Sequence, residues 1–394
     1  MDEMRSGLER LLRLALIAAL VAGLVYLAGY FLVGPFLFFQ TYLFAFMFCL
    51  EFSLGALVLF LLYLLVNGGW GMIIRRIVEA ASRTIWVMAL LFVPLLFGLV
   101  YLYPWSRPEV VAADYLLAHK TPYLNVPFFI IRAVIYFAIW ITLAYKVGGW
   151  ARSPEHTSNV QFRRRMQRSA AFGLIIAGVT ISFASIDWMM SLQYDWYSSI
   201  YGLLILSGQL LGSLAFALLL TPLLARYHPL SSVITHRHYR DLGAIMLSIV
   251  LFWAYIAYSQ YVIIWAGNLP FEVTWYLNRS DGGWLWVGIF IVVVQFALPF
   301  LALLSSNTKR NPRVLMGVGS LVIGVRLVDY FWHVAPAFRP GMLYVHWMDL
   351  VAPVALGAIW LAAFSWHLKR TPLVLPPDLE VPSTGEPHRE GITP

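Results

Sequence analysis

Three ionisable residues lie close together in an otherwise apolar stretch of the chain: Arg326, Asp329 and His333. On a helix that advances 100° per residue, their side chains fall within a sector of roughly 60°. A charged group at the centre of a bilayer costs roughly 2.5–3.5 kcal/mol on insertion scales. Three such groups on one face of a spanning helix therefore predict a polar site inside a membrane protein, of the kind that moves protons, ions or reducing equivalents.

Other apolar segments contain further ionisable residues at a similar expected depth. His346 and Asp349 begin the last apolar segment with i, i+3 spacing and therefore share one helix face. Asp187 lies near the end of the fifth apolar segment, Arg132 lies in the fourth, and Glu51 stands alone in the second. The predicted proton path consists of six residues, with two arginines that tune their charge: Glu51, Asp187, Asp329, His333, His346 and Asp349, with Arg132 and Arg326.

Two functional interpretations of these residues remain open. Oxidation of a quinol releases two protons, and a carboxylate or a histidine can accept each of them, which favours a proton route or a quinone-head pocket. In the structural alternative, Arg326 neutralises Asp329 and His346 neutralises Asp349. A haem between His333 and His346 is not expected, because paired histidine ligands usually face each other well inside the membrane. Glu51 is expected to be protonated, paired with another helix or part of a relay.

The composition identifies an integral membrane protein. Hydrophobic residues make up 61% of the 394 and charged residues only 12%, about half the charged fraction of a soluble domain. Apolar runs of 18 or more residues predict transmembrane helices, and a bilayer requires the backbone to satisfy its own hydrogen bonds. The predicted fold is therefore an all-α bundle of ten spans: 11–33, 37–65, 84–103, 127–147, 170–191, 199–224, 243–266, 284–305, 313–334 and 347–367.

The basic residues agree with ten spans and indicate an orientation. If the N-terminus is cytoplasmic, the six inner segments contain 21 of the 27 Lys and Arg residues. A missing or extra span would scramble this alternation, so both termini are predicted to lie in the cytoplasm. The net charge of +8 then reflects membrane orientation, and anionic lipid explains the short basic run 163–165 without a nucleic-acid partner.

The segments outside the spans contain no catalytic motif. The segment 369–394 is rich in proline and poor in hydrophobic residues, so it is predicted to be a disordered cytoplasmic tail that follows a transmembrane domain of residues 1–368. The sequence has no dinucleotide fingerprint, P-loop, zinc-ligand spacing or nucleophile elbow. The single cysteine, Cys49, cannot hold an iron–sulfur cluster, so we expect no metal and no covalent cofactor on this chain.

One segment between the second and third spans is predicted to lie on the inner surface of the membrane. Residues 73–82 have the pattern of an amphipathic helix, and Arg75 and Arg76 are expected to face the lipid headgroups.

Several motifs together resemble those of a known family. The chain contains Phe183-Ala-Ser-Ile-Asp187-Trp-Met-Met-Ser-Leu, followed by Trp196-Tyr-Ser-Ser-Ile-Tyr-Gly202. In these motifs it resembles the ActF subunit of bacterial alternative complex III, which belongs to the NrfD/polysulfide-reductase-like membrane subunits. Further matches lie in order along spans two to nine: 68–71, 75–76, 79–81, 101–105, 258–261, 265–270, 275–279, 309–312 and 326–332.

The resemblance implies an NrfD-like fold with two four-helix bundles, formed by spans two to five and six to nine, and two peripheral helices. It also implies a sister subunit of similar fold, ActC, an iron–sulfur subunit and subunits with c-type haems. In that family the quinol site is assigned chiefly to ActC, and ActF is described as a possible quinone-binding or proton-translocating partner. Relatives often have histidine just before the Gly-Gly-Trp turn, where this chain has Tyr63 and Leu64. That departure weakens any proposal for a site at the inner end of span two.

We therefore expect an integral subunit of a quinol:electron acceptor oxidoreductase in a bacterial cytoplasmic membrane. It would scaffold the sister subunit and translocate protons, with quinone or menaquinone as a candidate ligand and the redox centres on its partners. The alternatives are a purely structural assembly subunit and a secondary transporter. Transporters usually contain broken helices or inverted repeats near the midplane, and the sequence shows no paired glycine or proline interruptions.

Overall fold

The computed structural model describes residues 2–66, 68–151, 160–227 and 234–370. The described residues are mostly helical and contain no strand, and ten of the helices are long and apolar enough to cross a membrane. The prediction of an all-α protein with ten spans is therefore confirmed, and the chain is a multi-pass membrane protein. Most of the predicted tail, from residue 371 onward, lies outside the described residues.

Most of the spanning helices are longer than the predicted apolar runs, because several begin or end with polar turns. They are α1 (Asp2–Val33), α2 (Pro35–Val66), α3 (Gly69–Ser82) with α4 (Ile85–Phe97), α8 (Val126–Ala151), α10 (Val160–Trp188), α11 (Tyr201–Leu224), α13 (His236–Gly267), α15 (Trp284–Ile291) with the π-helix η3 (Val292–Ala297) and α16 (Leu298–Leu304), α18 (Pro312–Val334) and α19 (Trp347–Lys369). Short helices connect them: α5 (Leu99–Leu102), η1 (Pro104–Ser106), α6 (Pro108–Ala113), α7 (Tyr115–Lys120), η2 (Met190–Leu192), α14 (Pro270–Leu277), α17 (Ser306–Arg310) and η4 (Ala335–Ala337).

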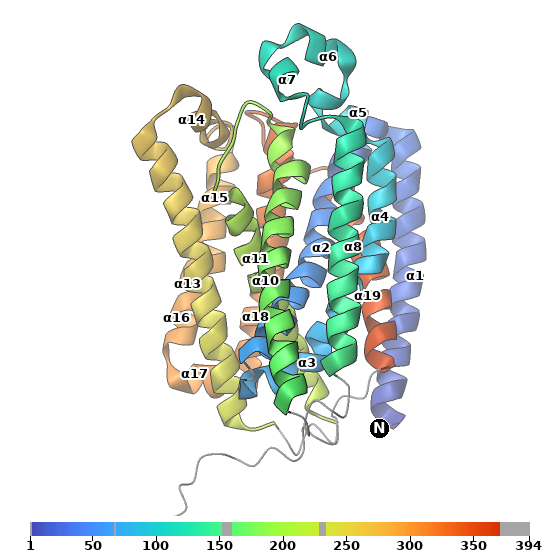
Figure 1. Ribbon diagram of the computed structural model, residues 1–394, viewed down its shortest axis with the longest axis vertical. Helices are drawn as coiled ribbons and strands as arrows, with labels where there is room; N and C mark the ends of the chain where they lie inside the picture. Colours follow the sequence, from blue (N-terminus) through green and yellow to red (C-terminus); the bar gives the residue numbers. More distant parts are fainter. Residues whose placement is uncertain (1, 67, 152–159, 228–233, 371–394) are drawn as a thin grey trace, which may run out of the picture.

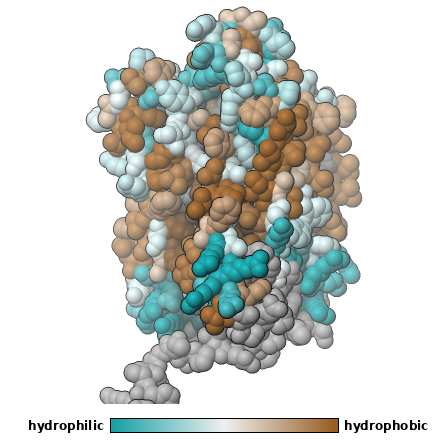
Figure 2. Space-filling model, in the orientation of Figure 1, coloured by the Kyte–Doolittle hydropathy of each residue, from teal (hydrophilic) through white to brown (hydrophobic). Residues whose placement is uncertain are grey.

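The two ends of the bundle differ in structure and charge. Helices α6, α7 and α14 cap one end, which we name the loop end; α3, α17 and the start of α1 lie at the other, which we name the basic end (Figure 1). Lys369 and Glu9 form an ion pair at the basic end, where α1 begins and α19 finishes. Hydrophobic side chains cover the visible flank between the ends (Figure 2), as expected for a surface in contact with lipid.

Helix α2 forms the centre of the bundle. It is almost completely buried, whereas most of α1 is exposed. α1 packs along α19, and α19 packs in turn on α2. The remaining spans pack around α2 and α11, which also lie against each other. Helices α3, α4 and α10 contact α2, and α10, α13 and α18 contact α11. Helix α8 packs on α4 and α10, α15 packs on α18, and α16 packs on α13.

The prediction that residues 73–82 form a helix on the membrane surface is wrong about where this helix lies. α3 is a helix, but it packs against α2 and α19, and Arg75 and Arg76 are buried instead of facing headgroups. Arg76 Nη1 lies 2.7 Å from Glu79 Oε2, and Arg83 Nη2 lies 3.1 Å from Glu79 Oε1. The acidic Glu79 on the same helix allows the arginines to enter the protein, since a buried charge requires a partner.

Candidate functional site

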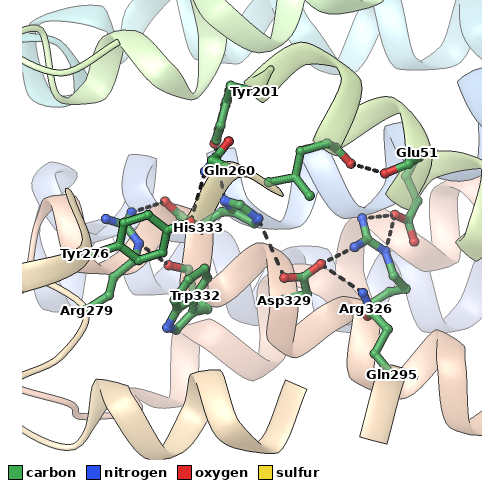
Figure 3. Close-up of polar contacts among 12 residues, drawn as sticks. Glu51, Tyr201, Gln260, Tyr276, Arg279, Gln295, Arg326, Asp329, Trp332 and His333 are labelled. Atoms are coloured by element: carbon green, nitrogen blue, oxygen red, sulfur yellow. Dashed lines mark hydrogen bonds and ion pairs between the residues drawn. The ribbon is translucent and has the colours of Figure 1, made fainter. Parts of the chain in front are cut away.

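Arg326 lies at the centre of a buried cluster between α18 and α2. Its Nε and Nη2 donate to Oε2 of Glu51 at 2.9 and 2.8 Å, and its Nη1 donates to Oδ2 of Asp329. Nε2 of His333 lies 3.6 Å from Oδ1 of Asp329, and Nδ1 of His333 lies 3.4 Å from the hydroxyl of Tyr201 on α11. Figure 3 shows Glu51, Arg326, Asp329 and His333 in a row. All four are at most 5% exposed, so the cluster is almost entirely buried in the protein.

Two glycines on α11 provide the space that this cluster occupies. A Cβ atom at Gly208 would meet the guanidinium of Arg326, and a Cβ atom at Gly212 would meet the carboxylate of Glu51. Small residues allow membrane helices to approach closely. The chain thus places a large cation and its carboxylate partner at the junction of α2, α11 and α18 without opening the helix packing.

The charges of this cluster do not balance. Two carboxylates, Glu51 and Asp329, share the single guanidinium of Arg326. Because an unpaired charge inside a membrane protein is costly, a proton on one carboxylate stabilises the cluster. Oε1 of Glu51 accepts no hydrogen bond among the described residues and is available to a proton. The arrangement can therefore hold and exchange one proton, with His333 as a second acceptor beside Asp329.

Arg132 and Asp187 form a second, separate ion pair. Nε and Nη2 of Arg132 donate to the two carboxylate oxygens of Asp187 at 2.8 and 3.0 Å, and the hydroxyl of Tyr136 donates to the same carboxylate at 2.9 Å. The third nitrogen of Arg132 donates to the carbonyl of Tyr123 at 2.9 Å. This bidentate pair between α8 and α10 has its hydrogen-bonding groups satisfied, which is typical of a structural contact.

Asp349 belongs to a third ion pair, whose cation the sequence did not reveal. Nη1 and Nη2 of Arg339 donate to the two carboxylate oxygens of Asp349 at 2.8 and 3.0 Å. The expected neutralisation of Asp349 by the His346 side chain is wrong, because only the backbone amide of His346 donates to Asp349, at 2.7 Å. Nδ1 of His346 instead accepts from the amide of Met348 at 3.3 Å. His346 and Asp349 thus form a capping box at the start of α19.

The structure therefore divides the six predicted proton-path residues among three groups. Glu51, Asp329 and His333 lie together, Asp187 lies with Arg132, and His346 and Asp349 lie with Arg339. Within the described residues, no side-chain hydrogen bond or ion pair connects one group directly to another. Helical periodicity linked Arg326, Asp329 and His333 correctly, but it could not assign partners on other helices.

The first group borders a groove between α13 and α15 at the loop end. The groove has a volume of about 790 Å³, and Asp329 and His333 form part of its wall. Three other polar residues, Gln260, Arg279 and Ser280, also line it, and the rest of the wall is mainly aromatic and aliphatic. Tyr258 on its rim is 68% exposed, so the groove is open on the flank of the bundle. This size, with apolar walls and a few polar groups, is typical of a small-molecule site.

The π-helix η3 forms part of the groove wall and adds a residue that the sequence analysis missed. Val292, Val293 and Phe296 of η3 line the groove. Nε2 of the buried Gln295, also on η3, donates to Oδ2 of Asp329 at 3.4 Å. Single turns of π-helix occur frequently at functional sites, and no periodic pattern in the sequence distinguishes this turn from the α-helix on either side.

The described residues offer no evident metal centre. No group of three or more His, Cys, Asp or Glu side chains in this part of the chain is arranged to hold a metal ion. Cys49 is buried within α2 as a free thiol. The groove is therefore the described feature with the clearest capacity for a ligand.

The sequence matches no known protein-family model. A search of curated proteins gave no match either.

Proposed function

We propose that this chain is a membrane subunit of a quinol:electron acceptor oxidoreductase and that the groove between α13 and α15 binds the quinone ring. One observation carries the proposal: a groove open on the apolar flank has a carboxylate and an imidazole, Asp329 and His333, in its wall. A lipophilic ring can enter from the bilayer, and the two side chains can accept protons from its hydroxyl groups.

The buried cluster behind the groove contains carboxylates that can accept a proton released from the bound ring. Asp329 contacts Arg326, and Arg326 contacts Glu51, so the charge on one carboxylate affects the proton affinity of the other. A proton that binds Asp329 from the groove therefore changes the proton affinity of Glu51, which lies deeper in the bundle. This part of the proposal involves three of the six predicted path residues: Glu51, Asp329 and His333.

The assembly follows from the resemblance of the motifs and is part of the proposal. We infer an NrfD-like subunit of alternative complex III that packs with a sister subunit of similar fold, ActC. An iron–sulfur subunit and c-haem subunits would supply the redox centres, and this chain would bind quinone or menaquinone but no covalent cofactor. The ten helices long and apolar enough to span a membrane support this inference.

We infer a bacterial cytoplasmic membrane, with the basic end of the bundle in the cytoplasm. The distribution of Lys and Arg supports this orientation through the positive-inside rule. Single-cysteine labelling of intact cells tests it, and the buried Cys49 gives little background. A thiol reagent that does not cross membranes should label Ser280→Cys at the loop end and spare Asn307→Cys at the basic end. The opposite pattern would overturn the orientation.

Purification of the native complex tests the proposed function. The chain should co-purify with haem-bearing and iron–sulfur subunits, and Asp329→Asn and His333→Gln should each lower quinol oxidation at least tenfold, as expected for a lost proton acceptor. Glu272→Gln is a matched control, because it removes an acid at the same end that does not line the groove. Full turnover in both groove variants would contradict a quinone role, and isolation without any redox subunit would contradict the assembly.

A scaffolding role without proton conduction is the second candidate. The observation that favours it is that two buried ion pairs, Arg132–Asp187 and Arg339–Asp349, are bidentate and join separate segments. The variants above distinguish the candidates. A pure scaffold would retain turnover and proton release in Asp329→Asn once the complex has assembled, whereas a proton-handling subunit would not.

A further inference from the structure

Arg279 is a buried cation that has no carboxylate partner. It follows α14, is 2% exposed, and lies within ion-pair distance of no acidic side chain among the described residues. Its guanidinium donates to the carbonyl oxygens of Trp275, Trp332 and His333 at 2.9, 3.1 and 2.8 Å and to the amide oxygen of Gln193 at 3.1 Å. These four acceptors hold the side chain in place, but all are neutral, so its charge is not balanced locally.

The surroundings of Arg279 make this charge unusual. The guanidinium carbon lies 3.7 Å from the ring centroid of Trp275 and 5.5 Å from that of Trp332. Burial lowers the pKa of Arg279 to about 9, against weaker opposing effects of Tyr201 and Tyr276. The side chain therefore remains positively charged at neutral pH. A cation retained in such an environment binds an anion strongly, because little water competes for it.

Arg279 lines the same groove as His333 and Asp329. Figure 3 shows His333 between Arg279 and Asp329, and Asp329 is already occupied by Arg326. Among the described residues, Asp329 is thus the only acid in the groove wall, and it is engaged by Arg326, whereas Arg279 contacts no carboxylate there. A ligand that supplies a negative oxygen beside Arg279 would complete the site.

We propose that the groove selects ring compounds in their oxyanion form and that Arg279 is the residue that recognises the negative oxygen. The ligand class is a quinone or hydroquinone with an ionised ring hydroxyl. This inference rests on the proposed function, because it assumes that the groove accepts a quinone-type ring. It adds the charge state of the bound ring and the residue that determines it.

The proton balance of this binding involves His333. When a hydroquinone enters, the O–H bond of the hydroxyl group next to Arg279 breaks. The electron pair stays on that oxygen, and the proton passes to the imidazole of His333. The imidazolium then lies next to Asp329, whose Oδ1 is 3.6 Å from Nε2. The step requires no oxidant, since only a proton moves. Arg279 favours it by stabilising the oxygen that is left behind.

A matched pair of ligands tests the inference on the purified native complex in lipid nanodiscs. Lawsone is a naphthoquinone whose ring hydroxyl is ionised at neutral pH, and its methyl ether has the same ring without the charge. Quenching of tryptophan fluorescence reports binding, because Trp253, Trp275 and Trp332 line the groove. Lawsone should bind at least about tenfold more tightly than the ether, as expected for a charge-assisted contact.

Variants of Arg279 test whether this residue causes the preference for lawsone over its methyl ether. The affinity ratio should fall to near one in Arg279→Gln and be partly retained in Arg279→Lys, which keeps the charge but loses the fork of donors. Asn278→Ala, which alters the residue next to Arg279 but lies outside the groove wall, should keep the full ratio. If Arg279→Gln does not assemble, the wild-type ratio and Arg279→Lys decide the matter.

The possible failures are distinguishable. If lawsone and its ether bind equally well to the wild type, or if Arg279→Gln assembles and keeps the preference, the inference about Arg279 is overturned and the quinone groove remains. If neither ligand binds the wild-type complex, the proposed function fails as well.

Discussion

Arg326 on α18 donates two hydrogen bonds to one carboxylate oxygen of Glu51 on α2, 275 positions earlier in the chain. The contact joins α2, the central helix of the bundle, to α18, and both side chains are completely buried. The same guanidinium also contacts Asp329. Arg326 therefore links the packing of α18 on α2 to Asp329 in the wall of the groove.

Removal of this arginine should destabilise the protein strongly. Arg326→Met leaves Glu51 and Asp329 buried without their cation, a loss expected to cost about 3–5 kcal/mol. Thermal unfolding of the purified protein in detergent measures the effect. Neutralising both acids in the same chain, with Glu51→Gln and Asp329→Asn, should recover most of the stability. If the triple variant is no more stable than Arg326→Met, charge balance does not explain the role of this arginine.

The glycines on α11 give a steric test of the same site. Gly212→Ala would place a methyl group against the carboxylate of Glu51, and overpacking of this kind costs roughly 1–3 kcal/mol. Gly324→Ala on α18 is the matched control, because a Cβ atom there has nothing within 4 Å. The control should be neutral or slightly stabilising, since alanine favours a helix more than glycine does. Equal melting temperatures for the two variants would show that the close approach of α11 is not needed.

The separation of the ion pairs predicts independent energies. Asp187→Asn and Asp329→Asn alter groups that share no hydrogen-bond partner, so their effects on unfolding should add within about 0.5 kcal/mol. A double-mutant cycle measures the coupling. Glu51→Gln with Asp329→Asn is the comparison, because both acids contact Arg326 and should couple by more than that amount. Strong coupling between Asp187 and Asp329 would instead support the single path that the sequence suggested.

The sequence predicted the spans well because the membrane imposes their length and composition. The length and hydrophobicity of each apolar run predict a spanning helix. The distribution of Lys and Arg between the loops supports the same number of spans independently. The one misplaced segment was α3, whose arginines have the pattern of a surface helix. They are buried because Glu79 lies one turn away and because α2 and α19 surround the helix. Helix periodicity alone does not report such neighbours.

The site was predictable only as far as its contacts are local. Arg326, Asp329 and His333 lie on successive turns of one helix, so their spacing placed them together. Glu51 on α2 and Arg279 after α14 reach the same region through tertiary packing, which sequence spacing does not report. Nor could spacing show that Asp349 pairs with Arg339, because the loop between α18 and α19 brings these two residues together.

The cap at the loop end should loosen in acid for a specific reason. The carboxylate of Asp114 accepts from the hydroxyl of Tyr194 at 2.6 Å and from the first amides of α7. The Tyr194 hydrogen bond, followed by those amides, lowers the pKa of Asp114, and the same contact raises the pKa of Tyr194 to about 12. A lowered carboxyl pKa stabilises the folded cap above the ordinary value of about 4, and this stabilisation is lost as the pH falls through the folded value.

Hydrogen exchange of the α7 amides measures this loss when wild type and Tyr194→Phe are compared at the same pH. At pH 6 the wild type should exchange more slowly, because its carboxylate is ionised and holds both the tyrosine and the start of α7. At about pH 3 the two proteins should converge, because a protonated carboxyl group accepts these hydrogen bonds weakly. Thr121→Ala, at the other end of α7, is the control. The ratio of its α7 exchange rates to those of the wild type should be the same at both pH values. A difference between wild type and Tyr194→Phe that persists unchanged in acid would mean that the tyrosine stabilises the cap by packing and not through the ionised carboxylate.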